Sequence, residues 1–196
     1  MKDLRLRGVN MLTIILMLLD ILLAFFTVLF IFRFFRVIFM RVKLVANIKS
    51  ICKSKKYSIK KIRSPFASVF YKSSKMDMTV NTQHNVYHVK FISSFSKKKI
   101  YHFVDENNYI TYSKIYFALP MAKDASTIPV FMSSHRFPII EKNEKINEKY
   151  VFLFNPMPND VTYIAQNGSK QIASNGSIIG GFTVYNGKGF CKILEN

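Results

Sequence analysis

The stretch VNMLTIILMLLDILLAFFTVLFIF, from Val9 to Phe32, is an almost unbroken apolar run. An α-helix rises about 1.5 Å per residue, so roughly 20 apolar residues cross the ~30 Å hydrocarbon core of a bilayer. The 24 positions of the run are enough to span with some tilt. A cleaved signal peptide would have a shorter apolar region and a small-residue cleavage site, whereas this run continues into FIFRFFR. The sequence therefore predicts a retained transmembrane helix over residues 9–32.

Asp20 is the only ionisable residue of this run. An acid near the middle of a span costs on the order of 3 kcal/mol, which the surrounding Leu, Ile and Phe residues can offset. One interpretation is an intramembrane contact with a partner that satisfies a protonated carboxyl. The other is a tolerated residue in a very hydrophobic helix, and the lack of a basic residue within the span favours it.

A strongly basic stretch follows the apolar run. Residues 33–63 hold eleven Lys or Arg and no acid, whereas three basic residues and one acid precede the run. Lys and Arg close to a membrane helix concentrate on its cytoplasmic side, so we expect residues 33–196 to be cytoplasmic at the cell membrane. The eleven residues are Arg33, Arg36, Arg41, Lys43, Lys49, Lys53, Lys55, Lys56, Lys60, Lys61 and Arg63.

The formal net charge of +18 favours anionic partners, either nucleic acid or acidic lipid. Basic residues directly beside a membrane helix favour anionic lipid headgroups, at about 1 kcal/mol per residue near the surface. The stretch 41–57 also has helical periodicity, so it is either a basic amphipathic helix on the headgroups or the first core helix of a domain, and we favour the core helix. Its apolar face comprises Leu44, Val45, Ile48, Ile51 and Cys52.

Cysteine and histidine give no sign of a metal or redox centre. Two cysteines without a CxxC motif and four scattered histidines predict no metal site and no cofactor. We expect both Cys52 and Cys191 to be reduced. Two Asn-Gly-Ser triplets, at 167–169 and 175–177, match glycosylation acceptors, but Asn-Gly is also a strong turn signal and is the better interpretation in a cytoplasmic domain.

The remaining residues are enough for one compact domain, and most of them favour strands. The predicted fold class is therefore α+β: a basic tail (1–8), a transmembrane helix (9–32), a basic juxtamembrane helix (33–56) and a single β-rich domain with few helices (57–196). The polar stretch 121–149 predicts mostly loop, with 141–149 as a possible helix, and 190–194 predicts a short closing helix. Strands are expected over 57–62, 76–82, 86–92, 100–104, 109–112, 150–154, 161–165 and 170–173.

One arrangement suggests chemistry. After the helix at 42–56, Asp77 opens one strand and Lys90 lies in the next, within KMDMTV (75–80) and YHVK (87–90). This pattern resembles a degenerate core of the PD-(D/E)xK nucleases over residues 42–92. The resemblance implies that Asp77 would help to hold a divalent metal and that Lys90 would orient or activate the attacking water. His88 stands where that family has its second carboxylate, so metal-dependent cleavage is not expected.

As a whole, the chain resembles uncharacterised bacterial single-pass membrane proteins, on the basis of its apolar helix, basic stretch, YSIKKIRSP segment, Asp/Lys strand pair, NPMPND step and Gly-rich tail. This resemblance implies an architecture and no activity. Two functions follow. The first is a membrane-anchored cytoplasmic module that binds anionic lipid or a protein at the inner leaflet. The alternative is a nucleic-acid-binding or vestigial nuclease domain, in which Asp77, Lys90 and His88 would be the candidate catalytic residues.

Overall fold

The structure is a computed structural model that describes residues 2–60, 63–64, 75–92, 99–104, 108–117, 126–138, 147–164 and 168–196. Its chain divides into two compact units, Met1–Arg36 and Val37–Asn196. The second unit includes the basic helix that follows the apolar run, so that helix belongs with the domain.

The helix α1 extends from Lys2 to Ser54 and supplies all the described structure of the first unit. Its apolar side chains from Met11 to Phe32 are exposed, and Asp20 is exposed among them. Among the described residues, α1 is the one helix long and apolar enough to cross a membrane, and its most hydrophobic window is not buried at all. A core helix of a soluble domain would bury much of such a window. The expected long apolar N-terminal helix is therefore present.

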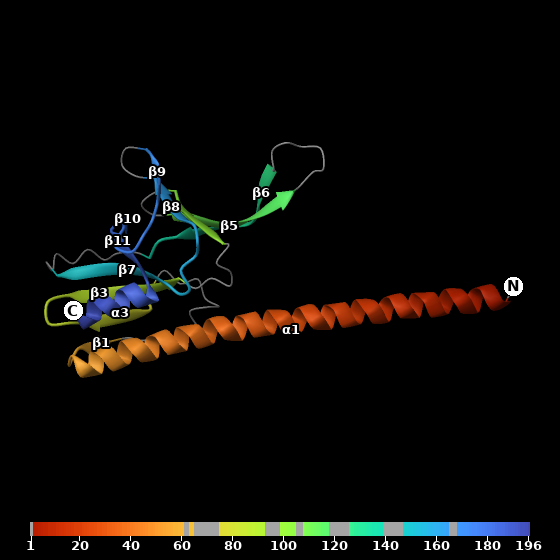
Figure 1. Cartoon of the computed structure of the whole chain (residues 1–196), viewed down its shortest axis with the longest axis horizontal. Helices are drawn as coiled ribbons and strands as arrows, with labels where there is room; N and C mark the ends of the chain where they lie inside the picture. Colours follow the sequence, from red (N-terminus) through yellow and green to blue (C-terminus); the bar gives the residue numbers. More distant parts are fainter. Residues whose placement is uncertain are drawn as a thin grey trace. The chain divides into compact units, whose positions relative to one another are not determined.

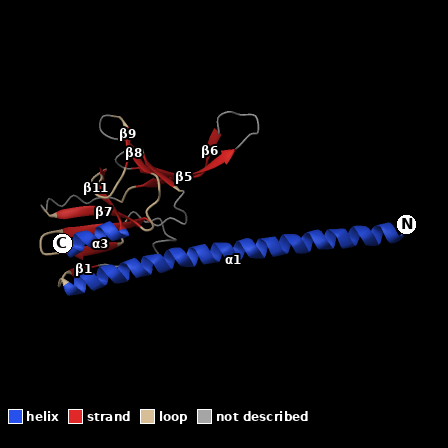
Figure 2. Ribbon diagram, viewed as in Figure 1, coloured by secondary structure: helices blue, strands red, loops and turns tan. Residues whose placement is uncertain are grey.

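The second unit is built on two β-sheets (Figures 1 and 2). The six-stranded sheet A has the order β1-β2-β3-β7-β11-β10. Its central strands β3, β7 and β11 are parallel, and the outer pairs are antiparallel. The strands are β1 (Ser58–Lys60), β2 (Met78–Asn81), β3 (Val86–Ile92), β7 (Glu148–Phe154), β11 (Phe182–Asn186) and β10 (Ile178–Ile179).

The five-stranded sheet B has the order β6-β5-β4-β8-β9. Strands β4 and β8 are parallel, and the other pairs are antiparallel. The strands are β6 (Ser126–Arg136), β5 (Asn108–Phe117), β4 (Ile100–Phe103), β8 (Val161–Ile164) and β9 (Lys170–Ile172).

Strand β7 is apolar throughout its second half because both faces of sheet A are covered. Val151 and Leu153 lie in one buried cluster together with side chains of α1 and of the C-terminal helix α3 (Gly187–Glu195). Phe152 and Phe154 lie in a second cluster with residues of sheet B. Successive residues of a strand point to opposite faces, so a strand buried on both sides has no polar alternation. The domain therefore has three layers: helices, sheet A and sheet B.

The C-terminal part of α1 is a core helix, as we expected. Leu44, Val45, Ile48 and Cys52 are buried against sheet A and α3, and Ile51 packs beside them. Because this apolar face is covered by protein, it is not available for insertion among lipid headgroups. The two cysteines are not joined to each other.

The short helix α3 packs closely against α1 and has a well-formed start. The side chain of Asn186 caps it by accepting a 2.7 Å hydrogen bond from the Gly189 amide. A Cβ atom on Gly187 would lie 3.0 Å from a methyl carbon of Leu44, so glycine permits this close approach. The helix begins three residues earlier than the expected 190–194 segment.

Two stretches differ from expectation. The polar region 121–149 was expected to be mostly loop, but β6 occupies Ser126–Arg136 and β7 begins at Glu148. Strand β6 lies at the edge of sheet B, where polar residues and Pro129 are tolerated, so it lacks a hydrophobic pattern. Strands β10 and β11 were also not expected in the Gly-rich tail. Residues 139–146, which include most of the possible helix, lie outside the described residues.

The turn at Asn175-Gly176 is present as predicted. Gly176 has a φ of 93°, a left-handed conformation that favours glycine, and its amide donates to the carbonyl of Val184. The turn therefore starts the β10–β11 hairpin region. Asn167 of the other triplet lies outside the described residues.

The core role of α1 can be tested with two neighbouring positions. Ile48 is fully buried and Lys49 is exposed. Ile48→Ala is expected to lower the free energy of unfolding by about 2–5 kcal/mol, because it leaves a cavity between α1 and sheet A. Lys49→Ala is the matched control, with a change within about 0.5 kcal/mol. Urea unfolding of the full-length protein in detergent would measure both, and equal small effects would contradict the core assignment.

Candidate functional site

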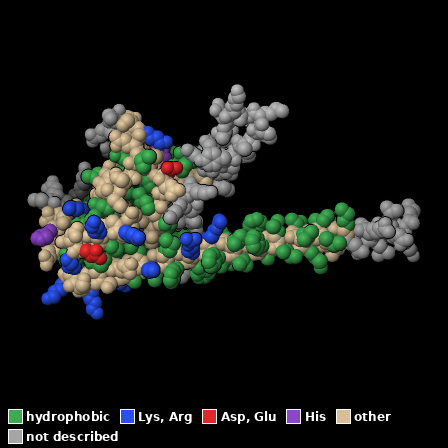
Figure 3. Space-filling view, viewed as in Figure 1, with side chains coloured by type: hydrophobic (Ala, Val, Ile, Leu, Met, Phe, Trp, Pro, Cys, Tyr) green, Lys and Arg blue, Asp and Glu red, His purple; other side chains and the backbone are tan. Residues whose placement is uncertain are grey.

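Most of the predicted basic residues are exposed and form what we call the basic surface. In the space-filling view, Lys and Arg side chains are visible along the helix of the second unit (Figure 3). An exposed cation keeps its hydration and can meet an anionic surface without a desolvation penalty. The exposed residues are Arg33, Arg36, Lys43, Lys49, Lys53, Lys55, Lys56 and Lys60.

Two of the eleven residues, Arg41 and Arg63, are not part of the basic surface. Arg41 is only 1% exposed, so its guanidinium faces the protein interior and not a headgroup. Arg63 is half-buried, with its Nη1 atom fully buried. Lys61 lies outside the described residues. Arg41 thus departs from the expected surface role because the helical repeat places it on the side of α1 that packs against sheet A.

Arg41 belongs instead to a buried charge cluster centred on Asp77, which is also 1% exposed. The Asp77 Oδ2 atom accepts a 3.0 Å hydrogen bond from the Phe91 amide. The same oxygen lies 3.7 Å from Arg41 Nη2 and 3.5 Å from Lys90 Nζ. One carboxylate therefore connects α1, the chain just before β2, and β3.

Strand pairing explains why Asp77 and Lys90 meet. Met78 is paired with Val89 in the antiparallel β2–β3 ladder, and the Asp77 amide donates to the Val89 carbonyl. Asp77 is thus opposite Lys90 and on the same face. The sequence pattern that singled out these two residues does bring them together.

The environment of Arg41 is poor in partners. Its guanidinium carbon lies 4.2 Å from the centre of the Phe91 ring, a cation–π distance. The Nη1 and Nη2 atoms are buried and make no hydrogen bond with the residues that the structure describes, and neither does Asp77 Oδ1. Burial lowers the pKa of Arg41 to about 10, against the opposing effect of the Asp77 charge and with a smaller contribution from Arg63.

Lys90 is 16% exposed, and its Nζ atom also donates a 2.9 Å hydrogen bond to the Lys75 carbonyl. Burial lowers its pKa, while the charge of Asp77 and a hydrogen bond to it act in the opposite direction. Arg41 and Lys90 thus both approach one acid, and the charge of Arg63 acts on both of them. The cluster favours a carboxylate that is held by cations and not one that is free to bind a metal ion.

His88, the third candidate catalytic residue, has other contacts. Its Nε2 atom is 3.6 Å from Glu148 Oε2, and its ring stacks on Tyr150 with centroids 5.0 Å apart. Its Nδ1 atom is 3.4 Å from the Thr79 hydroxyl across the β2–β3 pair. Among the residues that the structure describes, no group of three or more His, Cys, Asp or Glu could hold a metal ion. His88 therefore takes part in a cross-strand polar cluster.

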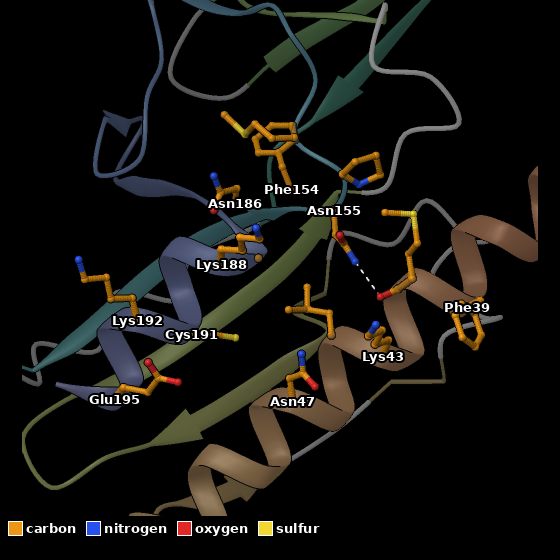
Figure 4. A pocket seen from close by; sticks show the side chains of 15 residues that line it. Phe39, Lys43, Asn47, Phe154, Asn155, Asn186, Lys188, Cys191, Lys192 and Glu195 are labelled. Carbon is orange, nitrogen blue, oxygen red and sulfur yellow. Dashed lines mark hydrogen bonds between the residues drawn. The ribbon is translucent and has the colours of Figure 1, made fainter.

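A separate groove lies within the second unit, between α1 and α3 (Figure 4). Its cavity volume is about 900 Å³, within the range of small-molecule sites. The turn after β7 closes one side, where the Asn155 side chain donates a 2.9 Å hydrogen bond to the Met40 carbonyl. Lys43 and Asn47 come from α1, and Lys188 and Lys192 come from α3. We call this feature the α1–α3 groove.

No protein-family model matches the chain, and comparisons with curated proteins and with solved structures found no significant match. The functional argument therefore depends on the chain's own residues.

Sequence reasoning missed the role of Arg41 and the α1–α3 groove. Arg41 lies three residues before Leu44 and seven before Ile48, so its place on the apolar face could have been found from helical spacing. The groove could not have been found that way. It depends on Asn155 and α3 being brought to α1 from positions more than a hundred residues away.

The buried cluster predicts a large effect for loss of its acid. Asp77→Ala is expected to lower the free energy of unfolding by about 3–5 kcal/mol, because Arg41 would stay buried without a counter-charge. The double variant Arg41→Met with Asp77→Leu should recover much of that loss, because it removes both charges. Asp160→Ala at an exposed acid is the control and should change stability by less than about 0.5 kcal/mol. If Asp77→Ala were as mild as the control, the cluster would not stabilise the fold.

Proposed function

We propose that this chain is a single-pass membrane protein whose C-terminal domain lies in the cytoplasm and binds anionic lipid headgroups of the inner leaflet. The observation that carries the proposal is the sequence of features along α1. The exposed apolar part of α1 continues directly into a part of the same helix whose apolar face is buried in the domain and whose exposed positions include Lys43, Lys49 and Lys53.

Distance along the chain divides the basic surface into two groups. Arg33 and Arg36 follow Phe32 by one and four residues, so they reach the headgroups whatever the orientation of the domain. Lys49 lies 17 residues beyond Phe32, about 25 Å along a helix. Exposed charges are largely screened beyond a Debye length of about 8–10 Å. The later lysines therefore contribute only when the domain lies close to the membrane.

From Leu44 to Ser54, lipid contact by α1 depends mainly on charge. The apolar face of this segment packs against sheet A and α3 and is not available to insert between lipids, whereas Phe39 and Val42, earlier in the helix, are exposed. Headgroup binding through exposed lysines alone is reversible and weakens with salt. In this proposal the helix holds the domain at the membrane, and the electrostatic attraction of the exposed lysines sets the distance between the domain and the surface.

A second candidate function is a nucleic-acid-binding domain descended from the PD-(D/E)xK nucleases. The specific observation in its favour is the 3.5 Å approach of Asp77 and Lys90 across β2 and β3. The same geometry weighs against catalysis, because Arg41 and the Phe91 amide already occupy the carboxylate. We therefore place this candidate second.

The orientation can be tested directly. A C-terminal tag on the full-length protein is expected to resist external protease in intact cells or spheroplasts and to be cleaved after permeabilisation, because the basic excess follows the span. A periplasmic marker and a cytoplasmic marker serve as controls. Cleavage of the tag in intact spheroplasts would reverse the orientation and remove both inner-leaflet lipid and nucleic acid as partners.

Lipid selectivity is the second test. Full-length protein purified from mixed micelles of phosphatidylglycerol and phosphatidylcholine should retain an excess of phosphatidylglycerol, and the excess should fall as salt rises. Arg33→Gln with Arg36→Gln should lower the excess, and neutralising Lys49, Lys53, Lys55 and Lys56 should lower it further if the domain lies at the surface. Quantification of the co-purified phospholipids gives the readout.

A matched control makes the same change in charge elsewhere on the domain. Lys149→Gln with Lys170→Gln alters two exposed lysines outside the basic stretch and should leave the excess unchanged. Equal retention of the two lipids by the unmodified protein would contradict lipid binding by the basic surface. Tight DNA or RNA binding with a steep salt dependence would favour the second candidate instead.

A further inference from the structure

The α1–α3 groove differs from the basic surface because it combines charge with apolar lining. Its buried floor includes Leu44 and Phe154, and Met40 and Met157 are half-buried in it. Phe39 lines the same groove and is 68% exposed. Flexible methionines and an exposed aromatic ring suit a ligand with a hydrocarbon part.

The polar lining of the groove is predominantly cationic. Lys43 comes from one wall and Lys188 and Lys192 come from the other, and among the described residues of the lining the one acid is Glu195. Lys43 and Lys188 are exposed and can approach an anionic group in the groove, whereas the side chain of Lys192 extends away from α1 (Figure 4). Three amide side chains, those of Asn47, Asn155 and Asn186, add hydrogen-bonding groups. A ligand that matches both linings has an anionic head and an apolar tail.

The groove is also close to the apolar run along the chain. Phe39 follows Phe32 by seven residues, which even a fully extended chain stretches to no more than about 25 Å. If residues 9–32 cross the bilayer, the chain keeps Phe39 within about 25 Å of the end of that span. The positive charge of the groove and its short distance along the chain from the apolar run therefore both favour an anionic membrane lipid as the occupant.

We infer that the α1–α3 groove binds one anionic phospholipid, with its phosphate near Lys43 and Lys188 and part of an acyl chain against Phe39, Met40 and Met157. This inference rests on the proposed membrane location but is distinct from general headgroup binding. It predicts a fixed stoichiometry and a lipid that stays bound after extraction from the bilayer. The basic surface predicts neither.

The test uses full-length protein in nanodiscs of phosphatidylglycerol and phosphatidylcholine, followed by native mass spectrometry in mild detergent. One retained phosphatidylglycerol per chain is expected. Lys43→Gln with Lys188→Gln should weaken its retention about 25-fold, since each lysine near a lipid phosphate contributes about fivefold. Lys53→Gln with Lys55→Gln removes the same charge outside the groove and should leave the single lipid in place.

Cys191 gives an independent readout because it lines the groove and is half-buried, whereas Cys52 is fully buried. Bound phosphatidylglycerol should slow alkylation of Cys191 in the folded protein several-fold relative to delipidated protein. Glycerol 1-phosphate alone, which has the same head chemistry and no acyl chain, should protect Cys191 much less. Cys52 should remain unreactive under both conditions, which confirms that the fold is intact.

The possible results separate the two proposals. Loss of bulk phosphatidylglycerol enrichment with one lipid still retained would contradict the basic-surface proposal and support the groove. Bulk enrichment without a retained lipid, equal retention of phosphatidylcholine, or equal protection by glycerol 1-phosphate would each overturn the groove assignment. Closure of the groove by a second copy of the chain, seen as a dimer with Cys191 protected in the absence of lipid, would overturn it as well.

Discussion

The second unit depends on the interactions that the buried carboxylate of Asp77 makes. This carboxylate is almost fully buried and accepts a hydrogen bond from the Phe91 amide, while Arg41 of α1 and Lys90 of β3 approach the same oxygen. Desolvating a guanidinium and an ammonium group is costly, and the attraction of this one acid offsets part of that cost. The same carboxylate fixes α1 to sheet A. The helix that follows the apolar run is thereby held in the domain by charge as well as by its apolar face.

The basic residues of this stretch therefore fall into two classes, those buried in the domain and those exposed to solvent. Arg41 is committed to the interior, where burial lowers its pKa to about 10, whereas Lys43 and Lys49 on the same helix are exposed. A count of Lys and Arg along this stretch therefore overestimates the number of positive charges that a membrane or nucleic acid can contact. The difference arises from helical geometry. Positions three, four and seven residues apart share the buried face, and positions between them face solvent.

The sequence predicted those parts of the fold in which the local pattern and the tertiary environment agree. The apolar helix, the packing face of residues 44–52 and the β2–β3 pair were predicted correctly, because each has a strong local pattern: an unbroken apolar run, a helical period and two strands joined by a short turn. Strand β6 was missed because an edge strand with Pro129 and many polar residues carries no alternation. Strand β11 was missed because Gly180 and Gly181 mark a turn just before it, and its parallel pairing with β7 is long-range.

The candidate sites also contain parts that the sequence could predict and parts that it could not. Asp77 and Lys90 could be paired from sequence because a hairpin fixes which residues are opposite each other. The identity of their neighbours could not be predicted, and the neighbours decide the chemistry, because Arg41 places a cation of the protein itself beside the carboxylate. The α1–α3 groove likewise requires α3 to dock on α1, which depends on Gly187 allowing close contact with Leu44. A helix that carries an interior ion pair on one side and a groove wall on another cannot be treated as a uniform basic patch, so charge on this chain has to be interpreted position by position.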